Sequence, residues 1–392
     1  MNFILFDDKN FRESLLPLTY TRPICDIRIG ILTIREKWEF LLNTKTSSLT
    51  QDYLSEKFQL IMQSNNCFIN GAILPDKIII NEIQKLKQNQ ALINNDIIIA
   101  VNSNSNEDIF DLEKFEIIKY NNSINFIKNT WDIFTKNNNE LISDFDLVTS
   151  NKTSEPLSST NTKIGNYPVF IEKGAIVECS VFNTTSGPIY IGKEAEVMEG
   201  SLIRGPFALC EYSTLKMGAK IYGATTIGPY CKVGGEVNNS VFLGYSNKAH
   251  DGFIGNSVIG EWCNIGADSN NSNLKNNYAE VKLWDYSQEK FINTNLQFCG
   301  LIMGDHSKCG INTMFNTGTV VGFSSNIYGS GFPRNFVPSF SWGGALGFTD
   351  FKLDKAVEIA KIVMERRNLI FDEKEYKIFE HIYSYSHKYR KI

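Results

Sequence analysis

Residues 191–233 read IGKEAEVMEGSLIRGPFALCEYSTLKMGAKIYGATTIGPYCKV, and an aliphatic residue recurs in this stretch at every sixth position. The recurring residues are Ile191, Val197, Ile203, Leu209, Leu215, Ile221, Ile227 and Val233. An α-helix has an apolar period of about 3.6 and a half-buried strand has a period of about 2, so neither explains this spacing. Short flat segments, each with one inward side chain before a corner, do explain it. The stretch therefore predicts a parallel β-helix, whose coils stack about 4.8 Å apart around an apolar core.

The period returns further along the chain at Met303, Cys309, Phe315, Val321 and Ile327. Between the two runs, residues 270–300 break the period with a polar sequence. A β-helix accommodates such an insertion as a loop that leaves a corner, and loops of this kind commonly build binding sites. We expect the active cleft in this region.

The remaining sequence predicts two flanking regions. The chain has 392 residues, which is too long for one ordinary domain. Residues 1–150 have the pattern of an α/β domain, with strands at 2–6 and 96–101 and a helix at 30–42. The β-helix domain is placed at 151–340, and residues 341–392 are expected to form a loop and an amphipathic helical tail.

Composition excludes several classes of function. The net charge is -4 and the basic residues are scattered, so a nucleic-acid partner is not expected. No signal peptide or apolar span is evident, which predicts a cytoplasmic protein without a membrane partner. None of the eight cysteines falls in a CxxC pair, so free thiols are expected and a cysteine metal site is not.

The segment from Asn247 to Asp268, NKAHDGFIGNSVIGEWCNIGAD, carries a family resemblance. It resembles the acetyltransferase signature of the bifunctional N-acetylglucosamine-1-phosphate uridylyltransferase and glucosamine-1-phosphate N-acetyltransferase family. It is also similar to the archaeal sugar-1-phosphate nucleotidylyltransferase and acetyltransferase enzymes, which match further through Asn273, Val281-Lys282 and Cys309-Gly-Ile-Asn312. The resemblance covers roughly residues 188–328 and implies a left-handed β-helix built from hexapeptide repeats. It also implies homotrimers with clefts between subunits, acetyl-CoA as co-substrate and an amino-sugar 1-phosphate as acceptor.

The resemblance assigns roles to particular residues. His250 matches the general base that takes a proton from the attacking amine, and imidazole is well suited to accepting a proton at neutral pH. Asn273 matches the residue that holds that amine. The matching candidates for substrate and coenzyme binding are Arg204, Glu236, Phe253, Asn264, Ala267 and Lys282.

A structural explanation competes with each assignment. A histidine at a corner of the β-helix can simply be a hydrogen-bonded structural residue, and Asn264 can cap a coil corner because Asn tolerates left-handed backbone. Lys282 and Arg204 can be ordinary surface charges. The sequence also departs from the family: Phe253 replaces a tyrosine and Asn238 replaces a lysine, so the identity of the sugar is open.

The N-terminal half has a second resemblance. Leu16-Pro17-Leu18-Thr19 followed by Arg22-Pro23 resembles the start of sugar nucleotidyltransferases, and the whole pattern looks like a divergent bacterial family of nucleotidyltransferase and acetyltransferase fusions. The glycines with which such enzymes approach a triphosphate are absent. Candidate contacts for UTP and Mg²⁺ are Asp7, Asp8, Arg12, Thr19, Arg22 and Arg28, and which residues would hold the metal is unknown.

We therefore expect a transferase with an α/β nucleotidyltransferase-like domain, a left-handed parallel β-helix and a terminal α-helix. The predicted activity is acetyl transfer from acetyl-CoA to an amino-sugar 1-phosphate such as glucosamine 1-phosphate, with possible uridylyl transfer to give UDP-N-acetylglucosamine for the cell envelope. Two alternatives stay open. One is a nucleotidyltransferase whose β-helix only assembles or regulates the oligomer, and the other is a non-catalytic scaffold that binds a sugar nucleotide.

Overall fold

The computed structural model describes residues 1–107 and 109–391, which form two compact units. The first unit comprises Met1–Leu15, Thr21–Ile27 and Leu32–Asn129, and the second comprises Leu16–Tyr20, Arg28–Ile31 and Thr130–Ile392. The second unit therefore includes two short pieces of the predicted N-terminal domain and also α5 (Asp132–Thr149).

The first unit is an α/β structure built on a six-stranded mixed sheet. Its strand order is β2 (Ser47–Leu49), β1 (Asn2–Phe6), β3 (Asn66–Asn70), β6 (Ile97–Asn102), β5 (Gln90–Asn94) and β7 (Glu116–Lys119). The strand β1 is parallel to both of its neighbours, whereas β6 is antiparallel to β3 and β5. The remaining elements are α1 (Lys9–Arg12), α2 (Ile34–Leu42), α3 (Asp52–Ser55), α4 (Lys77–Gln84) and the pair β4 (Ile73–Leu74) and β8 (Asn125–Phe126).

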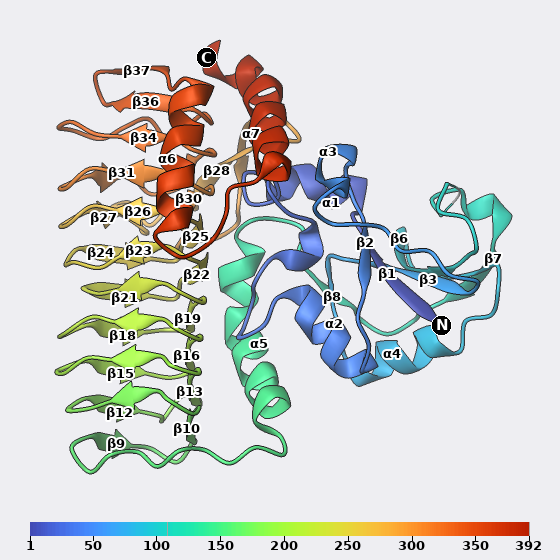
Figure 1. Cartoon of the computed structure of the whole chain (residues 1–392), viewed down its shortest axis with the longest axis horizontal. Coiled ribbons are helices and arrows are strands. Elements are labelled where there is room, and N and C mark those ends of the chain that lie inside the picture. Colours follow the sequence, from blue (N-terminus) through green and yellow to red (C-terminus); the bar gives the residue numbers. More distant parts are fainter. Residues whose placement is uncertain (108, 392) are drawn as a thin grey trace. The chain divides into compact units, whose positions relative to one another are not determined.

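The second unit contains a left-handed parallel β-helix, seen in Figure 1 as a stack of coils coloured from green to orange. Successive strands visit three faces in turn, and each strand pairs in parallel with the equivalent strand of the next coil. Face 1 comprises β10 (Val169–Ile171), β13 (Ile189–Ile191), β16 (Phe207–Leu209), β19 (Thr225–Ile227), β22 (Val241–Gly244), β25 (Val258–Glu261), β30 (Leu301–Met303), β33 (Thr319–Val321) and β35 (Phe336–Val337).

The other two faces follow the same plan. Face 2 comprises β11 (Ile176–Val177), β14 (Glu196–Val197), β17 (Thr214–Leu215), β20 (Lys232–Val233), β23 (Asn247–Lys248), β26 (Asn264–Ile265), β31 (Lys308–Cys309), β34 (Asn326–Ile327) and β36 (Ser341–Gly344), with the antiparallel β37 (Gly347–Asp350) at its end. Face 3 comprises β9 (Thr162–Ile164), β12 (Val181–Asn183), β15 (Leu202–Arg204), β18 (Lys220–Tyr222), β21 (Glu236–Asn238) and β24 (Phe253–Gly255), next to which lie the paired β27 (Asn270–Asn271) and β32 (Met314–Phe315).

The six-residue period forms the core of this β-helix. On face 1, Ile191 is in register with Leu209, while Val197 and Leu215 are in register on face 2. Every aliphatic or apolar residue of both predicted runs is buried in one continuous cluster. The prediction of a β-helix with one inward side chain per face is thus confirmed.

The helix α5 belongs to the β-helical unit because polar contacts join it to face 1 and to the short segment 28–31. Asn137 donates hydrogen bonds to the carbonyl of Ala224 (2.9 Å) and accepts one from the backbone of Gly30 (2.7 Å). The hydroxyl of Thr226 donates to the Gly30 carbonyl (2.8 Å). These groups are buried, and their mutual hydrogen bonds offset the cost of removing them from water.

One corner of the β-helix carries a stack of aromatic rings, one from each of four successive coils. The ring centroids of Tyr212 and Tyr230 are 4.9 Å apart, those of Tyr230 and Tyr245 are 5.0 Å apart, and those of Tyr245 and Trp262 are 4.3 Å apart. All four residues have positive φ angles, as the tight corner requires. We call this set the aromatic stack.

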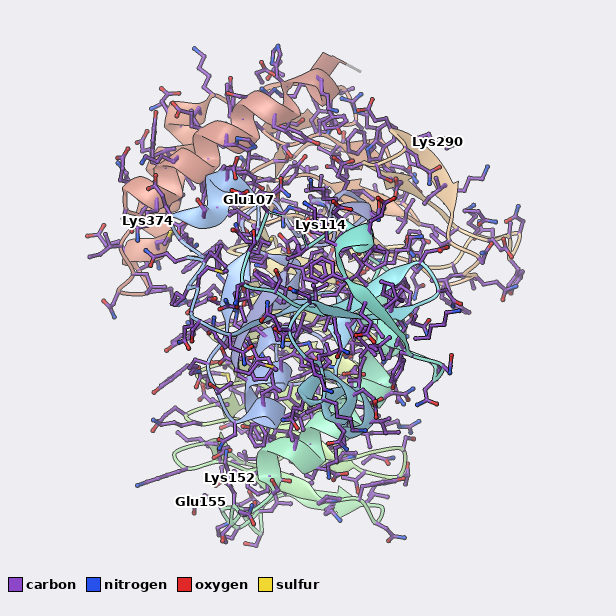
Figure 2. All side chains as sticks on the ribbon, turned by 90° about the vertical axis from the view of Figure 1, so that its right-hand side faces the viewer. Glu107, Lys114, Lys152, Glu155, Lys290 and Lys374 are labelled. Atoms are coloured by element: carbon purple, nitrogen blue, oxygen red, sulfur yellow. The ribbon has the colours of Figure 1, made fainter. Side chains whose placement is uncertain are left out.

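At each end of the β-helix, one strand is covered by another part of the chain. At the first coil, the backbone of Glu155 donates to the carbonyl of Ile171 (2.8 Å), and the side chain of Ser154 accepts from the Ile171 amide (2.9 Å). Figure 2 shows Lys152 and Glu155 together at this end. At the last coil, β37 pairs with the outer edge of β36.

The insertion after β27 forms an antiparallel hairpin, and the chain ends in helices. The hairpin consists of β28 (Lys282–Asp285) and β29 (Lys290–Asn293), and Lys290 is visible on it at the periphery in Figure 2. The helical tail comprises α6 (Leu353–Glu365) and α7 (Glu373–Tyr385), and it is followed by a 3-10 segment. No helix among the described residues has the length and apolar character needed to span a bilayer.

Candidate active site

His250 lies at the corner where the chain turns from β23 on face 2 to β24 on face 3. The residue is exposed, and no group in the described part of the chain forms a hydrogen bond with its ring. Its backbone carbonyl accepts a hydrogen bond from the amine of Lys248 (2.7 Å). The imidazole is therefore held through its backbone, and both ring nitrogens are available to a ligand.

A cavity of about 630 Å³ opens beside His250 on face 2. A row of four outward side chains forms its floor, because Lys232, Asn247, Asn264 and Lys308 pair in register on consecutive strands. We call this space the His250 cavity. Because neighbouring strands are about 4.8 Å apart, these four polar side chains form a regularly spaced row along the floor.

Two further walls complete the His250 cavity. One contains Tyr245 and Trp262, the last two rings of the aromatic stack. The other comes from the C-terminal end of α6, which contributes Arg366 and Arg367. The guanidinium of Arg367 donates to the side-chain oxygen of Asn247 at 3.4 Å, a long contact that joins the helix end to the floor.

The His250 cavity has a strongly positive lining. Lys232, Lys308, Arg366 and Arg367 contribute to it, whereas none of the described lining residues is a carboxylate. Burial lowers the pKa of Lys308 to about 8, and its amine donates to the carbonyl of His306 (2.8 Å). A cluster of cations without counter-charges favours an anionic ligand, and phosphate groups suit arginine and lysine donors.

The structure brings three of the predicted residues together in this cavity: His250, Asn264 and Ala267. Asn273 and Phe253 do not line it. The Asn273 amide donates to the side chain of Asn256 (2.8 Å), and the backbone of Phe253 donates to the side chain of Asn270. Asn273 is thus engaged with a neighbouring side chain on the other side of the corner.

Lys282 lines a second cavity of about 620 Å³, which we call the hairpin cavity. It lies against β28 and β29, as expected for a cleft at the insertion, and it contains two more cations, Lys275 and Arg334. The rings of Trp284 and Phe336 stack there with centroids 4.2 Å apart. No described residue that lines the hairpin cavity is acidic, so this space also favours an anion.

Arg204 and Glu236 line a third, shallower cavity of about 490 Å³ on face 3. The hydroxyl of Tyr222 donates to the Glu236 carboxylate at 2.6 Å, and burial together with this carboxylate raises the pKa of Tyr222 to about 12. Arg204 is exposed and has no partner within the described residues. Apart from Phe253, the predicted substrate-binding residues are therefore spread over three separate cavities.

In the first unit, the candidate nucleotide ligand Asp7 is engaged in internal contacts. It is buried and accepts hydrogen bonds from Arg12 (2.6 Å), the hydroxyl of Thr50 (2.5 Å) and the backbone of Ile24 (2.7 Å). Burial raises the pKa of Asp7, while the charge of Arg12 opposes that shift. Asp7 and Arg12 form a buried ion pair in which both carboxylate oxygens have donors.

The other N-terminal candidates are also occupied or lie elsewhere. Asp8 caps α1 through the backbone of Asn10 (2.8 Å) and accepts from Asn70 (3.1 Å). Arg22 is buried in the first unit, whereas Thr19 and Arg28 belong to the second unit, where Arg28 donates to the carbonyl of Leu243 (3.3 Å). Within the described ranges, no three His, Cys, Asp or Glu side chains are grouped so that they could hold a metal ion.

Sequence reasoning missed most of the cationic lining of the His250 cavity. Lys232 and Lys308 each precede an inward apolar residue, Val233 and Cys309, so the six-residue period already marks them as outward residues of one face. The same six-residue period predicts that Lys232 and Lys308 align with Asn264, which precedes the inward Ile265. It does not predict that Arg366 and Arg367 line the cavity, because no periodicity in the sequence shows where a terminal helix packs.

The N-terminal part of the chain, which includes the first unit and α5 of the second, matches a known family model. Residues 3–153 match a family described as sugar nucleotidyl transferase. The match covers the N-terminal part of the chain only, and no curated protein matches the sequence.

Several solved structures are distantly similar to the chain. A UDP-N-acetylglucosamine acyltransferase, LpxA from Bacteroides fragilis, is 12% identical with a TM-score of 0.29, covering 60% of this chain and 84% of that one. The polysialic acid O-acetyltransferase OatWY is 11% identical with a TM-score of 0.28, covering 48% and 88%. AntD, an N-acyltransferase from Bacillus cereus in complex with dTDP and coenzyme A, is 14% identical with a TM-score of 0.23, covering 52% and 91%. Similarity at this level carries no argument about function.

Proposed function

We propose that this chain is an acetyl-CoA-dependent N-acetyltransferase that acts on an amino-sugar 1-phosphate, with glucosamine 1-phosphate as the first substrate to test. The observation that carries the proposal is His250, an exposed imidazole without a partner in the described chain, at the edge of a cavity lined by cations. A reaction between a thioester and an amine needs a proton acceptor of this kind. The reaction is assigned to the cytoplasm, and its product would supply sugar nucleotides for envelope synthesis.

In the proposed reaction, the amino nitrogen of the sugar attacks the thioester carbonyl carbon. A carbon–nitrogen bond forms, the carbon–sulfur bond breaks, and the nitrogen loses one proton. His250 accepts that proton and passes it to the departing sulfur, so the products are an acetamido sugar phosphate and coenzyme A thiol. No other acid or base is needed to balance the step.

The His250 cavity suits the coenzyme. The four cations Lys232, Lys308, Arg366 and Arg367 can neutralise its phosphate groups, and Tyr245 and Trp262 offer aromatic surface. Asn264 and the backbone near Ala267 lie in the same cavity, beside His250. This arrangement supports binding of the thioester end next to the imidazole.

The acceptor site is proposed to form between subunits of a homotrimer. Asn273, Lys282, Arg204 and Glu236 do not line the His250 cavity within one chain, so residues from a second copy would have to bring an acceptor's phosphate and amine to His250. Light scattering coupled to gel filtration tests this point. A monomer that nevertheless acetylates the sugar would contradict it.

Nucleotidyl transfer with UTP is a second candidate function, favoured by the family match at residues 3–153. The expected Mg²⁺ does not fit the residues present. Both oxygens of Asp7 accept protein hydrogen bonds, Asp8 caps α1, and the described residues contain no group of three metal-ligating side chains. The proposal is therefore limited to acetyl transfer.

The deciding experiment incubates the purified chain with acetyl-CoA and glucosamine 1-phosphate and detects the acetylated product by mass spectrometry. Thiol reagents are unsuitable because Cys179 is exposed. His250→Ala should lower the turnover by at least about 100-fold. The matched control His387→Ala, an exposed histidine outside the His250 cavity, should change it by less than about twofold.

The same experiment separates the alternatives when UTP is added. Turnover of UTP without acetyl transfer would support a nucleotidyltransferase with a purely architectural β-helix and would contradict the proposal. Thermal stabilisation by sugar nucleotides without any turnover would support a binding scaffold, because a ligand that binds the native state raises its stability.

A further inference from the structure

A lysine points into the apolar core of the β-helix on the coil that carries His250. Lys248 pairs in register with Val233, an inward core residue of the preceding coil on face 2. Only 1% of Lys248 is exposed, which is comparable with the aliphatic residues above and below it. Burial of an amine in such a core is costly unless its hydrogen atoms find acceptors.

The amine finds two acceptors, and they belong to successive coils. The Nζ atom of Lys248 donates to the carbonyl of Gly234 at 2.9 Å and to the carbonyl of His250 at 2.7 Å. These carbonyls lie at the same corner of neighbouring coils, and a Cβ atom placed on Gly235 would meet the lysine nitrogen at 2.8 Å. The side chain therefore runs from the core to the inner side of the corner and ties the two coils together.

We propose that Lys248 is a positioning residue that fixes the backbone of the His250 corner, and hence the imidazole, for the acetyl transfer; this inference rests on the function proposed above. His250 itself has no side-chain partner among the described residues, so its place depends on its backbone. The Lys248 amine donates a hydrogen bond to the backbone carbonyl of His250, two residues along the chain. A misplacement of about 1 Å in a reacting group can lower a rate by about 100-fold, so this tether matters for the chemistry.

An apolar side chain at position 248 would fill the core but would not donate hydrogen bonds to the carbonyls of the corner. Methionine has a similar length and would fill the core, but it would leave the carbonyls of Gly234 and His250 without the donor that they have now. Two titratable groups act on the amine: the carboxylate of Asp251 beside the corner and the thiol of Cys309 in the core. The hydrogen bonds of the lysine amine go instead to the carbonyls of Gly234 and His250.

Lys248→Met tests the inference by kinetics. The turnover number should fall by about 10- to 100-fold. The KM values for both substrates should stay within about twofold, because the cavity lining is unchanged. The core variant Val197→Ala, on β14, is the matched control: it removes buried methyl groups far along the β-helix and should leave the turnover number unchanged.

A double variant shows whether Lys248 acts on the turnover number through His250 or independently of it. In the His250→Ala background, Lys248→Met should cause no further loss, because residues that act as a unit are not additive. Equal losses in both backgrounds would overturn the inference. So would an unchanged turnover number in Lys248→Met.

A second measurement does not depend on activity. The chain has only four histidines, so the imidazole NMR signals of His250 can be assigned by their loss in His250→Ala. Lys248→Met should replace one sharp signal by a broadened or multiple set, while Val197→Ala should not. If the wild type proves unable to acetylate, the proposed function fails, and this spectrum still decides whether Lys248 fixes the corner.

Discussion

The charge of Lys248 is coupled to the folding of the β-helix. Burial lowers the pKa of Lys248 to about 8, and the nearby carboxylate of Asp251 partly opposes this shift. A neutral amine has two N–H groups, which matches the two carbonyls that it contacts. The unfolded chain, by contrast, keeps a lysine of ordinary pKa near 10.4.

This coupling predicts a pH-dependent difference in stability between the wild type and Lys248→Met. Between about pH 8 and 10.4 the unfolded lysine holds a proton that the folded one has lost, so the free energy of unfolding of the wild type rises with pH relative to the variant. The gain should approach about 3 kcal/mol, since one pKa unit corresponds to about 1.4 kcal/mol. Urea denaturation of both proteins at pH 7, 8, 9 and 10 measures it, and a difference that does not vary with pH would contradict the assignment.

At the scale of elements, α6 closes one side of the His250 cavity. Its buried face consists of Ala356, Val357, Ala360 and Met364, while Arg366 and Arg367 follow at its C-terminal end. The apolar face docks the helix, and the arginines provide charge to the cavity. Because different residues carry the packing and the charge, the two arginines can be replaced while the helix stays packed in place.

Replacing both arginines by alanine should therefore weaken acetyl-CoA binding. The KM for acetyl-CoA should rise by about tenfold or more, because charge-assisted hydrogen bonds are worth about 1.5–3 kcal/mol each, while the turnover number should change little. The effect should shrink at high ionic strength. Lys355→Ala, which changes an exposed cation on the same helix outside the cavity, is the control and should leave the KM unaltered.

The elements also show how far the sequence could predict the structure. The six-residue period identified the β-helix and its inward residues because each period corresponds to one strand and one corner. It could not identify Lys248 as inward, because the six-residue spacing ends at Val233: the next inward residues, Val237 and Phe242, follow at shorter intervals and shift the positions after them. The placement of α5 and of Gly30 on face 1 depends on tertiary hydrogen bonds that leave no periodic signal.

The candidate site was predictable to a smaller extent than the fold. Motif matching singled out His250, Asn264 and Ala267, which do share a cavity. It also selected Asp7 and Arg12, which pair with each other in the interior of the first unit. A motif records residue types, and it does not record whether their polar atoms are already satisfied by neighbours.

At the scale of the whole β-helical unit, one strand edge is covered at each end of the stack of coils. Ser154 and Glu155 cover the first strand of face 1, and β37 covers the last strand of face 2. Open strand edges pair readily with other chains, so such coverings keep a solenoid finite.

Removal of β37 should therefore cause association. If Gly347–Asp350 is replaced by a Gly-Ser segment of the same length, the edge of β36 becomes available, and light scattering should detect species larger than those of the wild type at rising concentration. Leu346→Ser is the control. It removes a fully exposed apolar side chain from the turn between β36 and β37 and leaves the pairing of these strands intact. The prediction is contradicted if the Gly-Ser variant stays the same size as the wild type, or if Leu346→Ser associates to the same extent as the Gly-Ser variant.

The aromatic stack has a consequence for observing how this unit melts. Tyr212, Tyr230, Tyr245 and Trp262 come from successive coils, and their ring planes are nearly parallel. Stability in a solenoid depends on each coil and its neighbours, so the ends can fray before the middle. Because coupled chromophores lose their near-ultraviolet dichroism when one of them leaves the array, this column of rings reports optically on the order of the four coils that carry it.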